Sequence, residues 1–387
     1  MELTALPTAA GREERVVSFV TGWCHDRPDL TCTPDDAGNL VIERTDAPPS
    51  AHTTPLYITA HMDHPAFVVT GVSDDGAALD LEFRGGVKDP YFHNAPITAF
   101  TRDDEPVFAT LTDAGKAEPY RACTAVVDAE HRAHAKALGV GDVARWRLPD
   151  PVIEPTKIAG EDVGDVLWTH CCDDLAALGA ALVAFDRLRD APEASHVRLL
   201  LTRAEEVGFI GAIAACKMRT MPSNARVVLL ENSRASTIAP IGDGPIVRVG
   251  DRMSTFHPVL TGALANLSRE LTKESAERED ELPFAWQRKL MVGGACEASC
   301  YQAYGYEASC LCLPLGNYHN MSELDRVEDE EPEALEHARC RPEHVAINDW
   351  LGMVELLVAA GTRLEEPTPM LDKLEKLHEE RGAVLKG

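Results

Sequence analysis

The apolar positions of the first 66 residues change from a helical period to a strand period. A helix is predicted over residues 11–24, where apolar side chains recur every three or four positions. Two runs rich in β-branched residues follow at 38–45 and 55–63, and both predict strands. The residues between them, 46–55 ("DAPPSAHTTP"), have the composition of a loop.

From about residue 67 to residue 163 the pattern changes to short strands separated by Gly, Asp-Asp and Pro turns. The predicted strands in this stretch are 66–73, 78–85, 96–102 and 106–112. A helix is expected only afterwards, over 129–138. This stretch predicts a small β-rich domain at 67–163, inserted into a larger domain that consists of residues 1–66 and 164–387.

The larger domain alternates helical runs with nearly continuous apolar strands. Helices are predicted over 173–188, 208–218, 255–274 and 348–364, and buried strands over 196–202, 225–231 and 306–315. Such alternation is typical of a mainly parallel sheet covered by helices on both faces. The expected fold class is therefore α/β, a three-layer sandwich with a mainly parallel mixed sheet. The acidic run 323–337 is expected to be a solvated loop and helix start.

Composition and charge narrow the function classes. The chain of 387 residues is 45% hydrophobic and 26% charged, which is an ordinary balance for a globular protein. Its formal net charge of −26 disfavours binding to nucleic acid and to anionic membranes. There is no apolar run long enough for a membrane span and no secretory pattern at the N-terminus, so a cytoplasmic protein is expected.

The 11 cysteines form no C-x-x-C pair, which disfavours a structural zinc knuckle. They are expected to be reduced thiols, mostly in the core. Cys296 and Cys300 lie at helical i, i+4 spacing and are expected to pack. The chain also lacks a G-x-S-x-G motif, a Walker loop and a G-x-G-x-x-G motif, which disfavours a serine hydrolase and nucleotide chemistry.

Residues that commonly bind metals follow the predicted strands. They are His61 and Asp63, Glu205 and Glu206, Glu231, and His319, with Asp173 and Asp174 at a helix start. In an open α/β sheet, ligands bind beyond the carboxyl ends of the strands, so these side chains are expected to converge on one crevice. Two histidines with several carboxylates suit a catalytic site for zinc, cobalt or manganese.

Two metals ~3.5–4 Å apart need a bridging carboxylate, and this chain offers enough ligands for such a pair. Asp63 follows His61 with one residue between them. A ligating histidine usually donates its other N–H to a carboxylate, so Asp63 is expected to orient His61.

Taken in order, these motifs resemble the tetrahedral aminopeptidases, the glutamyl-aminopeptidase family of dinuclear metallopeptidases with a zinc-peptidase-like fold. "DAGNLV" is similar to the family's DxxGNLI, "AHMD" to its HxD, "CCDDL" to its LDDR and "TRAEEVGFIGA" to its TxQEEVGLRGA. "IGDGPIV" resembles LGxGPxI, "VGGACEA" resembles GGTDA and "LPLGNYHN" resembles IPxRYxHS. The match runs through most of the chain.

The resemblance implies a role for each matching residue. Asp173 would bridge two divalent metal ions, with zinc preferred and cobalt or manganese as alternatives. His61 and Glu231 would complete one metal site, and Glu206 and His319 the other. Glu205 would be the general base, and Asp63 would support His61.

The same resemblance implies a dinuclear aminopeptidase that hydrolyses N-terminal residues from short peptides through a metal-bridged water. Residues 67–163 would form the family's β-barrel-like lid and oligomerisation domain. Family members commonly assemble as tetrahedral dodecamers, so a homo-oligomer is expected.

This chain departs from the family pattern at several places. His64-Pro65 replace Glu and an aliphatic residue, Leu175 replaces Arg, and Glu231 stands where Asp is common. "GGACEA" and "GNYHN" lack the usual Thr-Asp, Arg and Ser. His64 is interpreted as a pocket-wall residue in preference to an extra ligand. Thiolate ligation by Cys171 or Cys172 is a lesser alternative, because the aligned carboxylate already fills that position.

Two further functions stay open because the altered motifs surround a complete ligand set. One is an amide hydrolase or deacylase on the same metal core. The other is a non-catalytic family member that acts as a binding or assembly protein.

Overall fold

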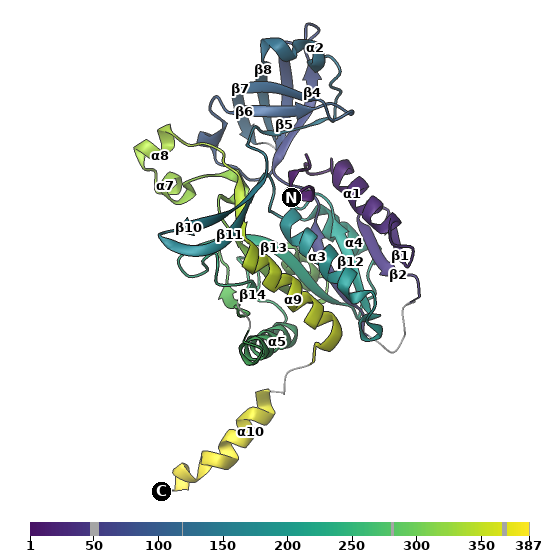
Figure 1. The fold of residues 1–387 in the computed structure, drawn as a ribbon, viewed down its shortest axis with the longest axis vertical. Helices are drawn as coiled ribbons and strands as arrows, with labels where there is room; N and C mark the ends of the chain where they lie inside the picture. Colours follow the sequence, from purple (N-terminus) through teal and green to yellow (C-terminus); the bar gives the residue numbers. More distant parts are fainter. Residues whose placement is uncertain (47–53, 118, 280–281, 366–369, 387) are drawn as a thin grey trace.

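The computed structural model describes residues 1–46, 54–117, 119–279, 282–365 and 370–386. These residues form an eight-stranded mixed sheet, a closed six-stranded barrel and a three-stranded sheet, as Figure 1 shows. The expected α/β fold with a mixed sheet and a β-barrel-like domain is therefore confirmed. Most of the predicted loop 46–55 lies outside the described residues, since 47–53 are among those left out.

The eight-stranded sheet has the order β1-β2-β12-β3-β13-β16-β14-β15. Its strands are β1 (Leu30–Pro34), β2 (Leu40–Arg44), β3 (Leu56–His61), β12 (Val197–Thr202), β13 (Arg226–Arg234), β14 (Ile246–Gly250), β15 (Gln287–Leu290) and β16 (Glu307–Leu315). The central strands β12, β3, β13 and β16 are mutually parallel, whereas β2 and β14 flank them in the antiparallel sense. The carboxyl ends of the four central strands therefore meet at one edge.

Helices cover both faces of this sheet. The helices of the larger domain are α1 (Glu14–His25), α3 (Leu175–Leu188), α4 (Ile210–Met218), α5 (Pro258–Glu277), α6 (Glu297–Ala303) and α9 (Ile347–Arg363). Leu199 and Leu201 join the core under α1, α3, α5 and α9, and Leu200 joins the core under α4 and α6. Successive strand residues point to opposite faces, so a nearly continuous apolar strand serves both cores.

The barrel closes in the order β4-β5-β8-β7-β6-β9 and stands apart from the large sheet in Figure 1. Its strands are β4 (Ala66–Val72), β5 (Ala78–Arg84), β6 (Pro96–Phe100), β7 (Pro106–Ala117), β8 (Arg121–Val127) and β9 (Val143–Trp146). The helix predicted over 129–138 is shorter than expected, because it consists of the 3-10 turn η3 (Ala129–His131) and α2 (Arg132–Ala135).

The third sheet joins the chain after the barrel to the larger domain. It has the order β10-β11-β17, with β10 (Val152–Ile158), β11 (Glu161–Thr169) and β17 (Glu343–Ala346). Residues 152–158 therefore pair within a sheet that also contains a strand from the C-terminal part of the chain. The exact division of the chain at residues 67 and 163 stays a prediction.

The C-terminal part contains short elements outside these layers. The two short helices α7 (Leu324–Glu328) and α8 (Pro332–Glu336) lie within the predicted acidic run, and we call residues 323–337 the acidic excursion. The helix α10 (Met370–Arg381) lies outside the body of the molecule in Figure 1. The remaining 3-10 turns are η1 (Leu3–Ala5), η2 (Asp89–Phe92), η4 (Pro192–Ala194), η5 (Tyr318–Asn320) and η6 (Gly382–Lys386). No helix among the described residues combines the length and the apolar character needed to span a membrane.

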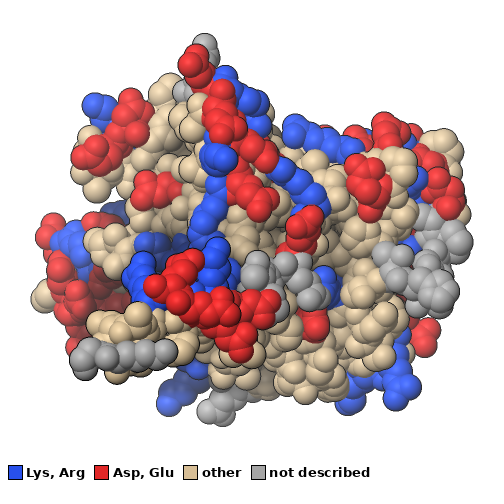
Figure 2. Space-filling view, turned by 90° about the horizontal axis from the view of Figure 1, so that it is seen from below, with Lys and Arg blue, Asp and Glu red and all other residues tan. Residues whose placement is uncertain are grey.

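Charged side chains of both signs lie interleaved on the face seen from the α10 end in Figure 2. Lys and Arg side chains on this face alternate with Asp and Glu side chains and leave no broad basic field. The exclusion of nucleic acid as a partner stays a prediction.

Candidate metal centre

The predicted ligands come from the carboxyl edge of the central strands. His61 is the last residue of β3, Glu205 and Glu206 follow β12, and Glu231 lies near the end of β13. His319 lies in η5, just after β16, and Asp173 lies between β11 and α3. The parallel arrangement of these strands brings together side chains that are more than 250 residues apart in the sequence, such as His61 and His319.

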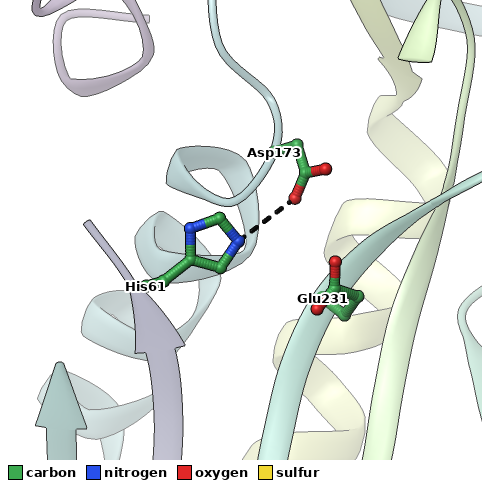
Figure 3. Close-up of side chains that lie close together, drawn as sticks. All are labelled: His61, Asp173 and Glu231. Atoms are coloured by element: carbon green, nitrogen blue, oxygen red, sulfur yellow. Dashed lines mark ion pairs between the residues drawn. The ribbon is translucent and has the colours of Figure 1, made fainter. Parts of the chain in front are cut away.

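The first cluster contains His61, Asp173 and Glu231, which Figure 3 shows from three different elements. Each of them offers one ligand atom, and these atoms lie within 4.8 Å of one another. His61 Nε2 lies 3.4 Å from Asp173 Oδ1. This is the set that the family resemblance assigns to one of the two metals.

The second cluster contains Asp173, Glu206 and His319, with ligand atoms also within 4.8 Å of one another. His319 Nε2 lies 3.5 Å from Asp173 Oδ2 and 3.4 Å from Glu206 Oε1. Asp173 therefore presents one oxygen to His61 and the other to His319, which is the geometry of a carboxylate between two sites.

The atoms that face these clusters lack hydrogen-bond partners. His61 Nε2, Asp173 Oδ1, Glu206 Oε1 and Glu231 Oε2 are all buried and make no hydrogen bond within the described residues. Buried polar atoms are normally hydrogen-bonded or bound to a metal, so this set of unpartnered nitrogen and oxygen atoms fits divalent cations. Imidazole and carboxylate donors without thiolate suit zinc, cobalt or manganese.

The pKa values in the cluster reflect the same crowding of buried acids. Burial raises the pKa of Glu205 and of Glu231, and it raises that of Glu206 to about 7. Burial opposes ionisation of His319, but Glu206 and Asp173 together raise its pKa to about 9. Burial also opposes ionisation of Asp173, which would raise its pKa, yet the close imidazoles of His319 and His61 hold that pKa below the ordinary value. Two imidazoles face this group of buried acids. A bound cation would add positive charge and so stabilise the ionised carboxylates.

Asp63 contacts His61 differently from the predicted orientation. His61 Nδ1 lies 3.1 Å from the main-chain carbonyl oxygen of Asp63 and 3.6 Å from its Oδ1. The Asp63 carboxylate accepts hydrogen bonds from the backbone N–H groups of Glu205 at 2.9 Å and Glu206 at 3.0 Å. Its side chain thus fixes the Glu205–Glu206 pair, and its main chain supports the imidazole.

His64 is not among the residues that line the large cleft, but it lines a small neighbouring cavity together with Pro65 and Asn320, so its interpretation as a pocket-wall residue stays a prediction. His64 Nδ1 lies 2.6 Å from the carbonyl oxygen of Asp173, and His64 Nε2 lies 3.1 Å from Asn320 Oδ1. Both ring nitrogens therefore have partners, which leaves neither free to bind a metal. His64 instead supports the loop that carries Asp173.

The neighbouring cysteines Cys171 and Cys172 are both buried. Cys171 Sγ donates to the Asp173 carbonyl oxygen at 3.2 Å, and burial raises the pKa of both Cys171 and Cys172. This disfavours thiolate ligation. Cys296 and Cys300 are buried in two apolar clusters, so the expectation that they pack is confirmed.

Sequence reasoning gave no role to several buried acids around the site. Glu343 and Glu297 have no exposed surface, and Glu343 accepts backbone hydrogen bonds from residues of two ligand loops. Asp174 accepts a hydrogen bond from the His61 backbone N–H at 3.2 Å. A lone Glu at the start of a short strand, as in "RPEHVA", is a weak signal, and only the tertiary fold brings it to the centre.

A cleft of about 710 Å³ opens beside the two clusters, with Glu231 and His319 among its lining residues. Its walls include the segment 86–88 of the barrel domain, residues 290–295, Met321 and side chains of α7. This volume lies in the range of ~300–1,000 Å³ that is typical for small-molecule sites. A small molecule bound in the cleft would therefore lie next to both ligand clusters.

Comparison with family models shows which protein family has this sequence. The model described as M42 glutamyl aminopeptidase matches residues 38–332. The chain belongs to the M42 glutamyl aminopeptidase family. Membership makes this M42 chain a peptidase and a metal-dependent hydrolase, as the sequence resemblance implied. None of the curated proteins compared matches it.

Solved structures similar to this M42 chain share its fold across nearly the whole length. The Pyrococcus horikoshii TET1 peptidase is 19% identical, with a TM-score of 0.68, and the match covers 94% of this chain and 98% of that one. An aminopeptidase from the archaeon Desulfurococcus kamchatkensis is 19% identical, with a TM-score of 0.67 and coverage of 95% and 94%. A TET aminopeptidase from a marine-sediment Thaumarchaeota archaeon is 16% identical, with a TM-score of 0.69 and coverage of 97% and 96%.

Proposed function

We propose that this M42 chain is a dinuclear metal aminopeptidase that removes N-terminal residues from short peptides. The observation that carries the proposal is the pair of three-residue clusters that share Asp173. His61 and Glu231 would complete one metal site, and Glu206 and His319 the other. Zinc is the preferred ion, and cobalt or manganese would suit the same donors.

The residues around the clusters would divide the reaction steps among them. When bound, two divalent ions supply Lewis-acid polarisation of the scissile carbonyl and lower the pKa of the attacking water. Glu205 would accept the proton of that water and return it to the leaving amine. Asp63 would keep Glu205 in position, because its carboxylate accepts the backbone N–H groups of Glu205 and Glu206.

A buried arginine in the cleft supports a preference for acidic N-terminal residues. Arg248 lines the cleft and is only 3% exposed. Its guanidinium donates to Ser233 Oγ and to the carbonyl oxygens of Gly250, Met291 and Gly294, and the described residues place no carboxylate within ion-pair distance of it. A buried cation with neutral partners would be stabilised by an anionic side chain of a substrate.

A homo-oligomer is also proposed for this chain. The Pyrococcus horikoshii TET1 peptidase can assemble into a tetrahedron or a large octahedral shell, which supports a tetrahedral dodecamer here. Sedimentation velocity tests the assembly, and a monomer at micromolar concentration would contradict it.

A cytoplasmic location is proposed as well, since all 11 cysteines are free, as expected for a reducing compartment.

The test of the function is hydrolysis of an aminoacyl-anilide panel together with N-acyl amino acids. We expect turnover of glutamyl or aspartyl anilide that is lost on treatment with a chelator and restored by zinc, cobalt or manganese. Activity on acyl substrates alone would favour the deacylase. Bound metal without turnover of any substrate would favour the binding or assembly protein.

A further inference from the structure

Glu343 lies where two ligand loops meet. It is the first residue of β17 and pairs with Thr169, the last residue of β11, from which the chain continues to Asp173. The next residue, His344, exchanges two backbone hydrogen bonds with Gly316, at 3.0 and 3.2 Å, just before the loop that carries His319. The third sheet therefore holds Glu343 between the two loops.

The Glu343 carboxylate is hydrogen-bonded to both loops. Oε2 accepts the backbone N–H groups of Cys172 at 2.6 Å and Asp173 at 3.0 Å. Oε1 accepts the backbone N–H of His319 at 2.8 Å. The buried Glu343 side chain thus fixes the main chain of Asp173, which both clusters share, and that of His319, which belongs to the second cluster.

The His319 loop needs such external contacts because its backbone conformation is costly. Asn317, His319 and Asn320 have φ angles of 52°, 54° and 63°, in the left-handed region. Non-glycine residues persist there only when the surrounding structure holds them. Further contacts that hold the His319 loop include His319 Nδ1 with the Gly86 carbonyl oxygen at 2.6 Å, Asn320 Nδ2 with the His170 carbonyl oxygen at 2.9 Å and Asn317 Nδ2 with the Pro342 carbonyl oxygen at 2.8 Å.

We propose that Glu343 is a positioning residue that couples the two metal sites by fixing the geometry between Asp173 and His319. This inference rests on the dinuclear function proposed above. A carboxylate can accept all three N–H groups, whereas an amide of the same shape turns an NH₂ group toward at least one of them. Loss of the carboxylate should therefore release His319 more than His61, which β3 holds independently.

The variants that test this role are Glu343→Gln, Glu343→Asp and the control Asp349→Asn. Asp349 has no exposed surface and accepts the backbone N–H groups of Gly242 at 2.8 Å and Gly244 at 2.7 Å, so it is a buried carboxylate of the same kind. Its partners belong to neither ligand cluster. Asp349→Asn therefore reports the general effect of removing a buried acceptor.

The experiment is calorimetric titration of the metal-free full-length chain with Zn²⁺, with the absorption spectrum of the Co²⁺ form as a second readout. We expect Glu343→Gln to weaken the second binding step by about 10–100-fold and to change the Co²⁺ spectrum, with a smaller effect on the first step. Glu343→Asp should recover part of the affinity because it keeps the charge. Asp349→Asn should lower the unfolding temperature without altering either step.

Each other outcome has a defined consequence. Wild-type affinity in both steps for Glu343→Gln would overturn the proposal, as would an equal loss of affinity in Asp349→Asn. If Glu343→Gln does not fold, wild-type second-step affinity in Glu343→Asp overturns the proposal, and weakened affinity supports it. Fewer than two ions bound by the wild type would refute the dinuclear function and this inference with it, whereas two ions with unaltered variants would refute this inference alone.

Discussion

The barrel and the metal centre bury their side chains in opposite ways. In the barrel, Phe67, Phe83, Phe92 and Trp146 fill the interior, with ring centroids 4.8–6.2 Å apart. The candidate metal centre instead gathers buried acids around two imidazoles, and several of their atoms have no hydrogen-bond partner among the residues that the structure describes. The barrel is therefore stable as an apolar unit, whereas the centre depends on charge compensation and on backbone donors.

Backbone N–H groups help this chain to keep many acids in its interior at the metal centre. Asp63 and Glu343 each accept two or more backbone N–H groups from the loops that carry ligands. Such hydrogen bonds stabilise a buried carboxylate and define the loop geometry at the same time. Substitutions in the barrel should therefore act on stability, and substitutions at the centre on chemistry and metal binding.

The sharpest contrast is expected for Glu205→Gln, which removes the proposed base but preserves its shape. We expect kcat to fall by about 10²–10⁴-fold, the range for a lost general base. Glu205 also forms a group with His61 and Glu206 whose ligand atoms lie within 4.8 Å of one another. Metal content should nevertheless stay close to the wild-type value, because Gln keeps an oxygen donor at this position and the five proposed ligands are unchanged. Steady-state kinetics with metal analysis checks this, and wild-type activity of the variant would remove Glu205 from its role.

Trp146→Ala should give the reverse result in the barrel. Trp146 is 2% exposed and contacts three Phe rings, so its truncation should lower the free energy of unfolding by about 3–5 kcal/mol. The folded variant should still bind metal. Denaturant unfolding measures the loss, with Val126→Ala on the exposed side of β8 as control. Loss of metal in the folded variant would show that the two regions are not independent.

A smaller effect is expected for Arg248→Gln in the cleft. Removing the buried cation should lower kcat/KM for glutamyl substrates by about 10–100-fold, as for loss of a charge-assisted hydrogen bond, and should change neutral substrates little. The exposed cleft residue Arg252 provides the control Arg252→Gln. An equal fall for leucyl and glutamyl anilides would contradict the proposed substrate preference.

The smallest effect is expected for Asp325→Asn on the acidic excursion. Asp325 pairs with Arg234, but its side chain is 87% exposed. Exposed ion pairs contribute little, so the free energy of unfolding should change by less than about 1 kcal/mol. Thermal unfolding at low and high salt measures this, and a loss of several kcal/mol would mean that the excursion is part of the stable core.

The strand ends that carry the candidate ligands could be predicted from the sequence, because strand ends are local features. His61, Glu205 and Glu231 each follow an apolar run whose period is visible without the fold. Glu343 could not be predicted in this way, since β17 lies outside the large sheet and meets the site through the third sheet. Arg248 was missed for a similar reason, because several of its partners come from segments distant in sequence.

The proposed function requires one metal pair held by His61, Asp173, Glu206, Glu231 and His319. An anomalous difference map from crystals of the zinc-reconstituted chain tests this pair directly. We expect two peaks, one among His61, Asp173 and Glu231 and the other among Asp173, Glu206 and His319. A single peak, or peaks away from these residues, would contradict it.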